Sequence, residues 1–258
     1  MKQITGIKKL KKAIEVTFDE DLVVVVEPEL VIKYHLNVGN TLDEATFLSF
    51  DNENMYLSTL RFALSKLKKM LTVKELKDIL STRDVPISIQ RRVLNHAIER
   101  KYLDDLAYAK MYLSLRQYQE GPQMMKHRLK EKGISDAIIQ MIFADYLEKD
   151  IVESLVKSKL TSMKKKTKKQ AFQTIKMQLI AKGFDHDVID RSLHFNVEQY
   201  QGDERMLLEK AYQKIQHTYQ SKLSGYELEQ KIKEKLYQKG FSYDMIKAYL
   251  EEIKLQSW

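Results

Sequence analysis

Apolar residues recur with a helical period along most of the chain. From Asn54 onward they return every three or four residues, which places them on one face of a helix, as in the run Leu57, Leu60, Ala63, Leu64 and Leu67. The second, third and later runs of this kind are separated by short polar turns. The pattern therefore predicts a chain of consecutive amphipathic helices.

The first fifty residues follow a different pattern. Residues 13–18 alternate between apolar and polar side chains, and residues 22–27 contain four consecutive valines, with residues 18–21 as the turn between them. With Ile4–Ile7 ahead, this predicts a hairpin or a three-stranded antiparallel sheet. Residues 29–36, preceded by Pro28, predict a short helix, and Thr41 or Asp43 can cap the helix that follows. Because so small a sheet is marginal alone, we expect it to dock on the helical body.

One sequence motif, called a phrase below, recurs along the chain and marks its repeats. It reads Leu, two residues, a basic residue, Gly, an apolar residue and a helix cap, and it begins at Leu129, Leu179 and Leu236, with a degenerate copy at Leu80. Glycine fits the left-handed position that ends a helix, and the following Ser or Asp caps the next helix. The anchor residues Asp84, Gly133, Gly183 and Gly240 are 49, 50 and 57 residues apart. Such spacing indicates one supersecondary unit repeated. Because Asp84 replaces glycine in the first copy, we expect that turn to differ in shape.

The repeat defines the predicted architecture. The fold is mainly α: an elongated, curved array of tandem three-helix repeats with a small N-terminal antiparallel β element. The predicted boundaries are a hairpin with short helices over residues 1–52, and repeats over residues 53–100, 101–149, 150–201 and 202–258.

Charge adds a preference for polyanionic partners. The net charge is +8, and most of the excess lies in residues 51–100, with ten Lys/Arg against six Asp/Glu, and residues 151–200, with ten against five. Such unevenness suggests nucleic acid, against the alternative of ordinary solvated lysine. The chain has no cysteine and no apolar stretch near the roughly 18 residues of a spanning helix, which predicts a cytoplasmic protein. No heptad seam argues for a dimer, so we expect a monomer.

The sequence gives little support for catalysis. The neighbouring carboxylates Asp104 and Asp105 point about 100° apart on a helix, so Asp104 is better explained as an N-cap. The six histidines show no metal-ligand spacing, and there is no phosphate loop or nucleophile motif. We therefore expect a protein that is not an enzyme and needs no cofactor or metal.

Basic clusters are the candidate DNA-binding residues. Five lysines lie within six positions, and this set could contact several phosphates or simply form a solvated joint: Lys164, Lys165, Lys166, Lys168 and Lys169. A second basic region in repeat one adds Arg91, Arg92, Lys68 and Lys69. Repeat two is neutral but crowded with tyrosines, and helical spacing predicts that most of Tyr102, Tyr108, Tyr112 and Tyr118 are core.

Repeat two also carries a family resemblance. Residues 101–109 read Lys-Tyr-Leu-Asp-Asp-Leu-Ala-Tyr-Ala, followed by Arg116, Gly121 and the segment Arg128–Ile134. This set resembles the RecX family, regulatory proteins of the RecA recombinase, whose pattern begins Gly-Tyr-Leu-Asp-Asp. Here Lys101 replaces the leading glycine, and Pro122 follows Gly121 where the family more usually has a small or basic residue. The match covers about residues 55–255, and the N-terminal strands resemble the longer forms from Firmicutes.

The resemblance implies a function in DNA repair, recombination and the SOS response. Family members dock along the groove of the RecA filament on single-stranded DNA and limit its assembly, ATP hydrolysis and strand exchange. The implied partners are RecA and single-stranded DNA, with double-stranded DNA left open and no membrane. Repeat two then becomes the candidate recombinase-binding surface, with Tyr102, Asp105, Tyr108, Tyr112, Arg116, Lys126 and Arg128.

Two other functions stay open from the sequence. One is a helix-turn-helix transcription factor, although no helix begins with the Arg, Asn and Gln of a base reader. The other is a helical scaffold for protein partners without DNA affinity.

Overall fold

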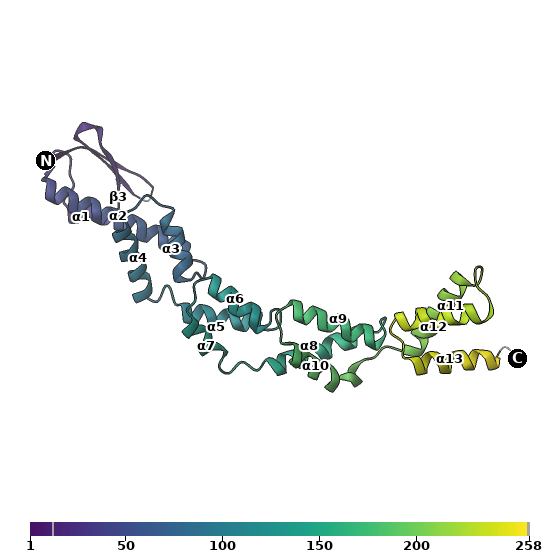
Figure 1. The fold of residues 1–258 in the computed structure, drawn as a ribbon. Coiled ribbons are helices and arrows are strands. Elements are labelled where there is room, and N and C mark those ends of the chain that lie inside the picture. Colours follow the sequence, from purple (N-terminus) through teal and green to yellow (C-terminus); the bar gives the residue numbers. More distant parts are fainter. Residues whose placement is uncertain (12, 257–258) are drawn as a thin grey trace. The chain divides into compact units, whose positions relative to one another are not determined.

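The structure is a computed structural model that describes residues 1–11 and 13–256 (Figure 1). Residue 12 of the predicted N-terminal element and residues 257–258 of the predicted fourth repeat lie outside the described part. The chain forms two compact units, Met1–Met111 with Leu129–Ile139, and Tyr112–Arg128 with Gln140 onward. Each unit is described by itself.

The first unit begins with an antiparallel sheet. Strands β1 (Lys2–Lys9), β2 (Ile14–Phe18), β3 (Val23–Val26) and β4 (Thr41–Leu42) lie in the order β3-β2-β1-β4. In the registers, Ile7 pairs with Val16, Val16 with Val24, and Lys2 with Leu42. The sheet has one strand more than predicted, because Thr41 joins β4 instead of capping a helix. A 3₁₀ turn, Asp19–Asp21, links β2 to β3 as predicted.

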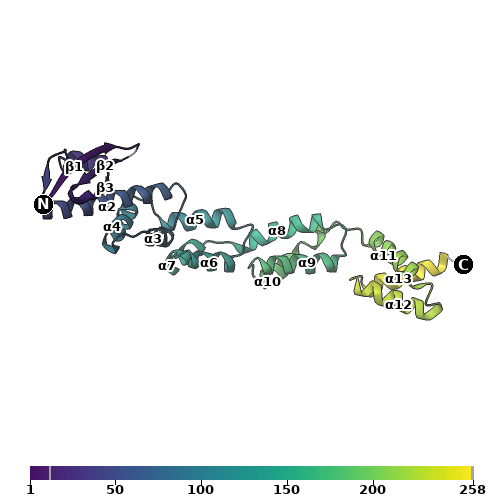
Figure 2. The ribbon, with the colours of Figure 1, turned by 90° about the horizontal axis from the view of Figure 1, so that it is seen from above.

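The sheet packs on a long helix, α2 (Glu44–Lys66), and on the short helix α1 (Pro28–Lys33) (Figure 2). Asp43 caps α2 by accepting the Thr46 N–H at 2.8 Å. Buried Asn54 ties α2 to the sheet edge, because its amide donates to the Val25 carbonyl (2.9 Å) and accepts the Glu27 N–H (3.1 Å). We expected short helices before residue 53, but α2 runs through this point. Its first half covers the sheet, and its second half joins the helical core.

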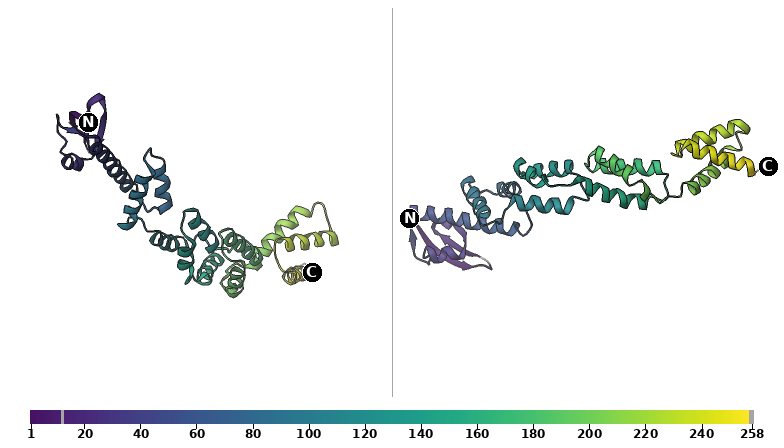
Figure 3. Two further views of the ribbon diagram at one scale, coloured as in Figure 1. Left: turned by 60° about the vertical axis from the view of Figure 1, so that its left-hand side comes forward. Right: turned by 90° about the horizontal axis from the view of Figure 1, so that it is seen from below.

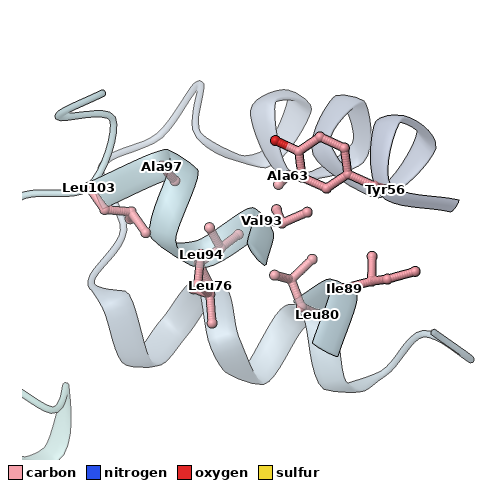
Figure 4. Packing of buried hydrophobic residues seen from close by; sticks show 9 residues of the cluster. All are labelled: Tyr56, Ala63, Leu76, Leu80, Ile89, Val93, Leu94, Ala97 and Leu103. Atoms are coloured by element: carbon pink, nitrogen blue, oxygen red, sulfur yellow. The ribbon is translucent and has the colours of Figure 1, made fainter. Parts of the chain in front are cut away.

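The rest of that core comes from α3 (Val73–Ser81) and α4 (Ile87–Glu99). Figure 4 shows Leu76 and Leu80 of α3 directed toward Val93 and Leu94 of α4. Thr72 and Glu75 form a capping box at the start of α3. The turn after α3 has no residue with positive φ, which confirms that the turn at Asp84 differs from the glycine-containing copies.

The next three helices are α5 (Asp105–Arg116), α6 (Pro122–Glu131) and α7 (Asp136–Phe143). As predicted, Asp104 caps α5, because its carboxylate accepts the Ala107 N–H at 2.8 Å. Helix α7 ends at residue 143, earlier than the predicted end near residue 149, where a turn leads into α8. The division between the two units runs within this group.

The second unit contains two further three-helix groups (Figure 3). Helices α8 (Glu148–Ser162), α9 (Lys168–Ala181) and α10 (His186–Phe195), with a short 3₁₀ segment (Val197–Gln199), share one apolar core. Helices α11 (Glu204–Tyr219), α12 (Gly225–Gln238) and α13 (Tyr243–Gln256) share another. The tandem three-helix architecture and the N-terminal antiparallel element are therefore confirmed.

The repeated glycines end helices as predicted. Gly133, Gly183 and Gly240 have φ angles of 83°, 86° and 91°. The residue after each glycine donates its N–H to the carbonyl of the leucine that begins the repeated segment, for example from Ile134 to Leu129 at 3.0 Å. This is the bond pattern of a Schellman ending.

These glycine stops also join neighbouring repeats, which the sequence does not reveal. In each joint, the start of a repeat's second helix donates a hydrogen bond to the stop of the next repeat. In the first unit, Thr72 Oγ1 donates to the Lys132 carbonyl at 2.7 Å. In the second unit, the Gly121 N–H donates to the Lys182 carbonyl (2.7 Å), and Thr167 Oγ1 donates to the Lys239 carbonyl (3.2 Å). One backbone site thus ends a helix and anchors the preceding repeat.

Candidate nucleic-acid and partner interface

The five-lysine cluster lies on the segment between α8 and α9 and on the first turn of α9. Lys164, Lys165, Lys166, Lys168 and Lys169 are all exposed. Thr167 between them is buried and caps α9, because its hydroxyl accepts the Gln170 N–H at 3.3 Å. The same hydroxyl makes the joint to Lys239. Burial of one threonine therefore fixes the backbone from which the lysine side chains extend.

Two further contacts hold this segment. The Tyr200 hydroxyl donates to the Lys166 carbonyl, and the Lys166 ammonium donates to Thr174 Oγ1 at 2.9 Å. Lys169 lies over the Tyr237 ring, 5.3 Å from its centroid. The sequence left open whether this segment contacts phosphates or is simply a solvated joint. In the structure its backbone is anchored, and its lysine side chains are exposed to solvent.

The electrostatic setting of the cluster favours anions. Helix α9 has no acidic residue in its first turn, and the positive end of its dipole adds to the lysine charges. The nearest recorded carboxylate contact is Glu204, whose Oε1 accepts the Lys168 N–H at 2.8 Å. Across residues 1–11 and 13–256, no ion pair or side-chain hydrogen bond is recorded for Lys164, Lys165 or Lys168. Three cations are thus available to phosphate oxygens.

The basic residues of the first helical group lie at two separate positions. Arg91 and Arg92 are exposed on α4, and the Arg92 guanidinium lies 3.9 Å from the centroid of the Tyr56 ring on α2. Lys68 and Lys69 are exposed just beyond the end of α2 at Lys66, about 15 Å further along that helix than Tyr56. They are two separate basic positions on the same group of helices.

Three of the predicted partner-binding residues lie in the first unit. Tyr102 is 52% exposed, and nothing in its position conflicts with a contact role. Asp105, in contrast, accepts the Val73 N–H at 2.9 Å and so caps α3 from the following repeat. Tyr108 is half-buried, with the Lys132 ammonium 5.5 Å from its ring centroid, and Lys132 also bonds to Glu75 at 2.5 Å. Asp105 and Tyr108 therefore help to hold the joint between the first two repeats together.

The other four lie in the second unit, and two of them surround a carboxylate that the sequence analysis missed. Glu120 is 6% exposed and bonds to the Tyr112 hydroxyl and to Arg128 Nη1, both at 2.9 Å. Burial, reinforced by the bond to Glu120, raises the pKa of Tyr112. The only hint in the sequence is an acidic residue eight positions from both partners. Tyr112 and Arg128 thus hold the turn before α6.

Arg116 and Lys126 remain on the surface. Arg116 bonds to the Gln119 side chain at 2.8 Å, and the Lys126 ammonium is 4.9 Å from the Phe143 ring centroid. The expectation that most tyrosines of this repeat are core was wrong. Tyr118 is 54% exposed, Tyr102 is similar, and the other two are only partly buried. Tyr102 and Tyr118 lie just before and just after α5, so the helical period does not decide their burial.

Other chemistry is not visible in the described part of the chain. Residues 1–11 and 13–256 bring together no group of three His, Cys, Asp or Glu side chains that could hold a metal ion. Within the same residues, every helix is too short or too polar to cross a membrane.

Comparison with known proteins gives a consistent family. Residues 104–141 match the model of the second three-helix domain of RecX, and residues 203–250 match that of the third three-helix domain. Regulatory protein RecX of Bacillus licheniformis is 32% identical over 257 residues, covering 97% of both chains. Regulatory protein RecX of Bacillus subtilis is 28% identical over 263 residues, again covering 97% of both chains.

Solved structures agree on the fold. A crystal structure of regulatory protein RecX superposes with a TM-score of 0.55 at 20% identity, covering 74% of this chain and 98% of the other. The crystal structure of RecX from Lactobacillus salivarius gives 0.50 at 23% identity, covering 56% and 97%. Taken with the near full-length sequence matches, these similarities show that the chain belongs to the RecX family of regulatory proteins.

Proposed function

We propose that this protein is a non-enzymatic regulator of the RecA recombinase that binds along the groove of the filament on single-stranded DNA. Bound there, it limits filament assembly, ATP hydrolysis and strand exchange. It acts in the cytoplasm as a monomer. Membership of a family of regulatory proteins supports the regulatory part of this proposal, and the exposed lysines at the start of α9 support the nucleic-acid part.

The cationic residues suggest a division of labour on the filament. Lys164, Lys165 and Lys168 carry no recorded internal ion pair, so their charges are the best candidates for DNA phosphates, with Lys166, Lys169, Arg91, Arg92, Lys68 and Lys69 as further contacts. The candidate protein-contacting residues are then the exposed Tyr102 in the first unit and the exposed Arg116 and Lys126 in the second. Asp105 and Tyr108 hold the joint in the first unit, and Tyr112 and Arg128 hold the turn before α6 in the second.

A charge-reversal series tests the role of the lysine cluster. The triple variant Lys164→Glu, Lys165→Glu, Lys168→Glu should lose three phosphate contacts. The slope of log affinity against log salt concentration should then become shallower by about 2. Inhibition of recombinase ATPase on single-stranded DNA should then require about tenfold more protein or greater.

The chain offers a matched control. Lys210, Lys214 and Lys222 are exposed lysines on or just beyond α11, and reversing all three changes the net charge by the same amount. This control should inhibit like the unmodified protein. Unchanged inhibition and an unchanged salt slope in the cluster variant would remove the DNA role of the lysines. Duplex DNA in a parallel titration tells whether the contact is selective for single strands.

A further inference from the structure

An open groove lies between α8 and α10 in the second unit, outside the lysine cluster. Its volume is about 420 Å³, and its lining is mostly apolar. Lys149 and Glu153 contribute one wall from successive turns of α8. Val188, Arg191, Ser192 and Phe195 contribute the other, at the spacing of one face of α10.

Phe195 is unusual in this groove. It is the last residue of α10, and 78% of it is exposed, although its neighbours on the same helix, Ser192 and Leu193, are 5% and 3% exposed. A ring left bare at the mouth of a groove offers a flat apolar face to a ligand. Single exposed apolar residues are common, so the case depends on what surrounds the ring.

The groove that Phe195 lines carries two cations, Lys149 and Arg191, and one carboxylate, Glu153. Glu153 pairs with Lys157 at 3.0 Å, so its charge is already balanced. Within residues 1–11 and 13–256, no ion pair is recorded for Lys149 or Arg191, although Arg191 Nε donates to the Asp187 carbonyl at 3.2 Å. Arg191 lies one helical turn before Phe195. The groove therefore combines an exposed aromatic face with two cations available to an anion.

The Phe195 end of the groove lies near the lysine cluster. Helices α8 and α10 start together, because Glu148 Oε1 accepts the Asp185 N–H at 2.7 Å. At their far ends Tyr200, five residues after Phe195, bonds to the Lys166 carbonyl. Five residues span at most roughly 18 Å. One short stretch of single-stranded nucleic acid, a few nucleotides long, could therefore contact both the Phe195 ring and the lysine cluster.

We infer that this groove is a base-stacking subsite for single-stranded nucleic acid, in which Phe195 stacks on a base while Arg191 and Lys149 contact phosphates. Aromatic faces with cationic rims are how proteins hold single strands without sequence preference. A protein occupant would also suit the apolar wall, but the unpaired cations and the adjoining lysines favour a polyanion. The inference deepens the proposed function by naming the base-contacting part of its nucleic-acid surface.

The test uses the full chain and bare oligonucleotides, so it does not depend on recombinase. The probes are a fluorescent thymidine 20-mer and a 20-mer of the same backbone with abasic positions, both at low salt. The unmodified protein should bind the thymidine strand more tightly. Phe195→Ala should weaken that binding by about 5- to 100-fold and abolish the preference over the abasic strand. Its salt slope should stay unchanged, because no phosphate contact is lost.

Two further variants separate stacking from structure. Phe195→Trp should restore the preference, and in a Trp258→Phe background the emission of the introduced indole should be quenched by the thymidine strand and not by the abasic strand. Lys164→Glu with Lys165→Glu should weaken both strands equally. Thermal melting of Phe195→Ala should match the parent, since the ring is exposed.

Several results would overturn the subsite. They are no binding of the unmodified protein to either strand at low salt, equal binding of both strands, or no effect of Phe195→Ala on the bare thymidine strand. If Phe195→Ala binds the oligonucleotide normally but inhibits recombinase poorly, the groove takes a protein surface instead. In that case the proposed function would stand while this inference fails.

Discussion

One departure of this chain from the family pattern, Lys101 in place of glycine, lies at a helix end with a left-handed backbone. At the end of α4, the Tyr102 N–H donates to the Ala97 carbonyl (2.8 Å) and the Lys101 N–H to the Ile98 carbonyl (2.9 Å). This is the bond pattern found at Gly133. Lys101 has a φ of 55°, a conformation that costs a residue with a Cβ about 1–2 kcal/mol. The glycine that opens the family's pattern at this position would remove that cost.

Replacing Lys101 with glycine should therefore stabilise the protein. Lys101→Gly should raise the free energy of unfolding by about 0.5–1 kcal/mol, because relief of the left-handed strain exceeds the added entropy of the unfolded chain. Denaturant titration of the full chain measures this. Lys101→Ala removes the same charge but keeps the Cβ, so it should show no such gain. Equal stability of the two variants would contradict the backbone explanation.

Residue roles were predictable where the signal is local. Asp104 and Thr72 cap helices as their spacing predicts, because a cap and its partner lie within three residues. Asp105 was assigned to a partner surface instead, since its actual partner, the Val73 N–H, is 32 residues away. Buried Glu120 escaped notice for a similar reason: no local pattern distinguishes it from a surface glutamate.

The same joint connects successive three-helix repeats. The N-terminus of each second helix donates to the glycine stop of the next repeat, so the stop needs a bare backbone as well as positive φ. A Cβ on Gly183 would lie 2.9 Å from the Met124 backbone nitrogen, and one on Gly133 would lie 2.6 Å from Lys74 Cβ. The first repeat has no preceding three-helix repeat to dock. A glycine stop is therefore not needed at Asp84.

Gly121 gives the sharpest test of the joint. A Cβ there would lie 2.2 Å from the carbonyl carbon of Gly183, and neither backbone can yield as a flexible side chain could. Gly121→Ala should lower the free energy of unfolding by about 1–3 kcal/mol or more. In contrast, Gly6→Ala places its Cβ at an ordinary 3.6 Å from Thr17 and should be far milder. Thermal melting compares the two. Similar midpoints would argue against close backbone packing at the joint.

The first joint should also depend on pH. Burial pushes the pKa of Glu75 upward, but the Lys132 ammonium and the Thr72 N–H bond to its carboxylate and bring the pKa below its ordinary value of 4.5. Stability from this pair is thus complete above pH 4.5 and is lost as pH falls through the lowered pKa. The Lys132 pKa is raised by Glu75, so the pair persists to high pH.

Glu75→Gln isolates this effect. At neutral pH it should cost about 0.5–1 kcal/mol, because the pair is about one-third exposed. Between pH 6 and 3, its urea midpoint should fall less than that of the parent. Glu99→Gln, at the exposed end of α4, serves as the control and should follow the parent. A parent-like acid profile in Glu75→Gln would assign the acid sensitivity to other carboxylates.

Helix ends were predictable where a cap or a glycine stop marks them, as at Asp104 and Gly133, because these are local signals. The failures have physical causes. Helix α2 passes through the predicted boundary because Asn54, which looks like a surface residue, is buried and satisfied by the Val25 and Glu27 backbone. Strand β4 is only two residues long and shows no alternation of its own.

At the scale of the whole molecule, the tandem three-helix groups carry the family assignment, and each joint fixes neighbouring groups within one unit. The elongated, curved array and the exact repeat boundaries stay predictions from the sequence period. The surface properties are distributed accordingly: exposed lysines at the start of α9, and exposed Tyr102, Leu115 and Tyr118 around α5. This distribution is what the proposed contact with both DNA and protein requires.

Co-sedimentation with recombinase filaments tests the central claim most directly. Filaments formed on single-stranded DNA are pelleted with this protein at physiological salt, and bare single-stranded DNA serves as the control. The protein should pellet with the filaments at concentrations where bare DNA retains little of it, because protein and DNA contacts act together. Equal retention by bare DNA would point to a DNA-binding protein without a recombinase partner, and no retention by filaments would contradict the proposed function.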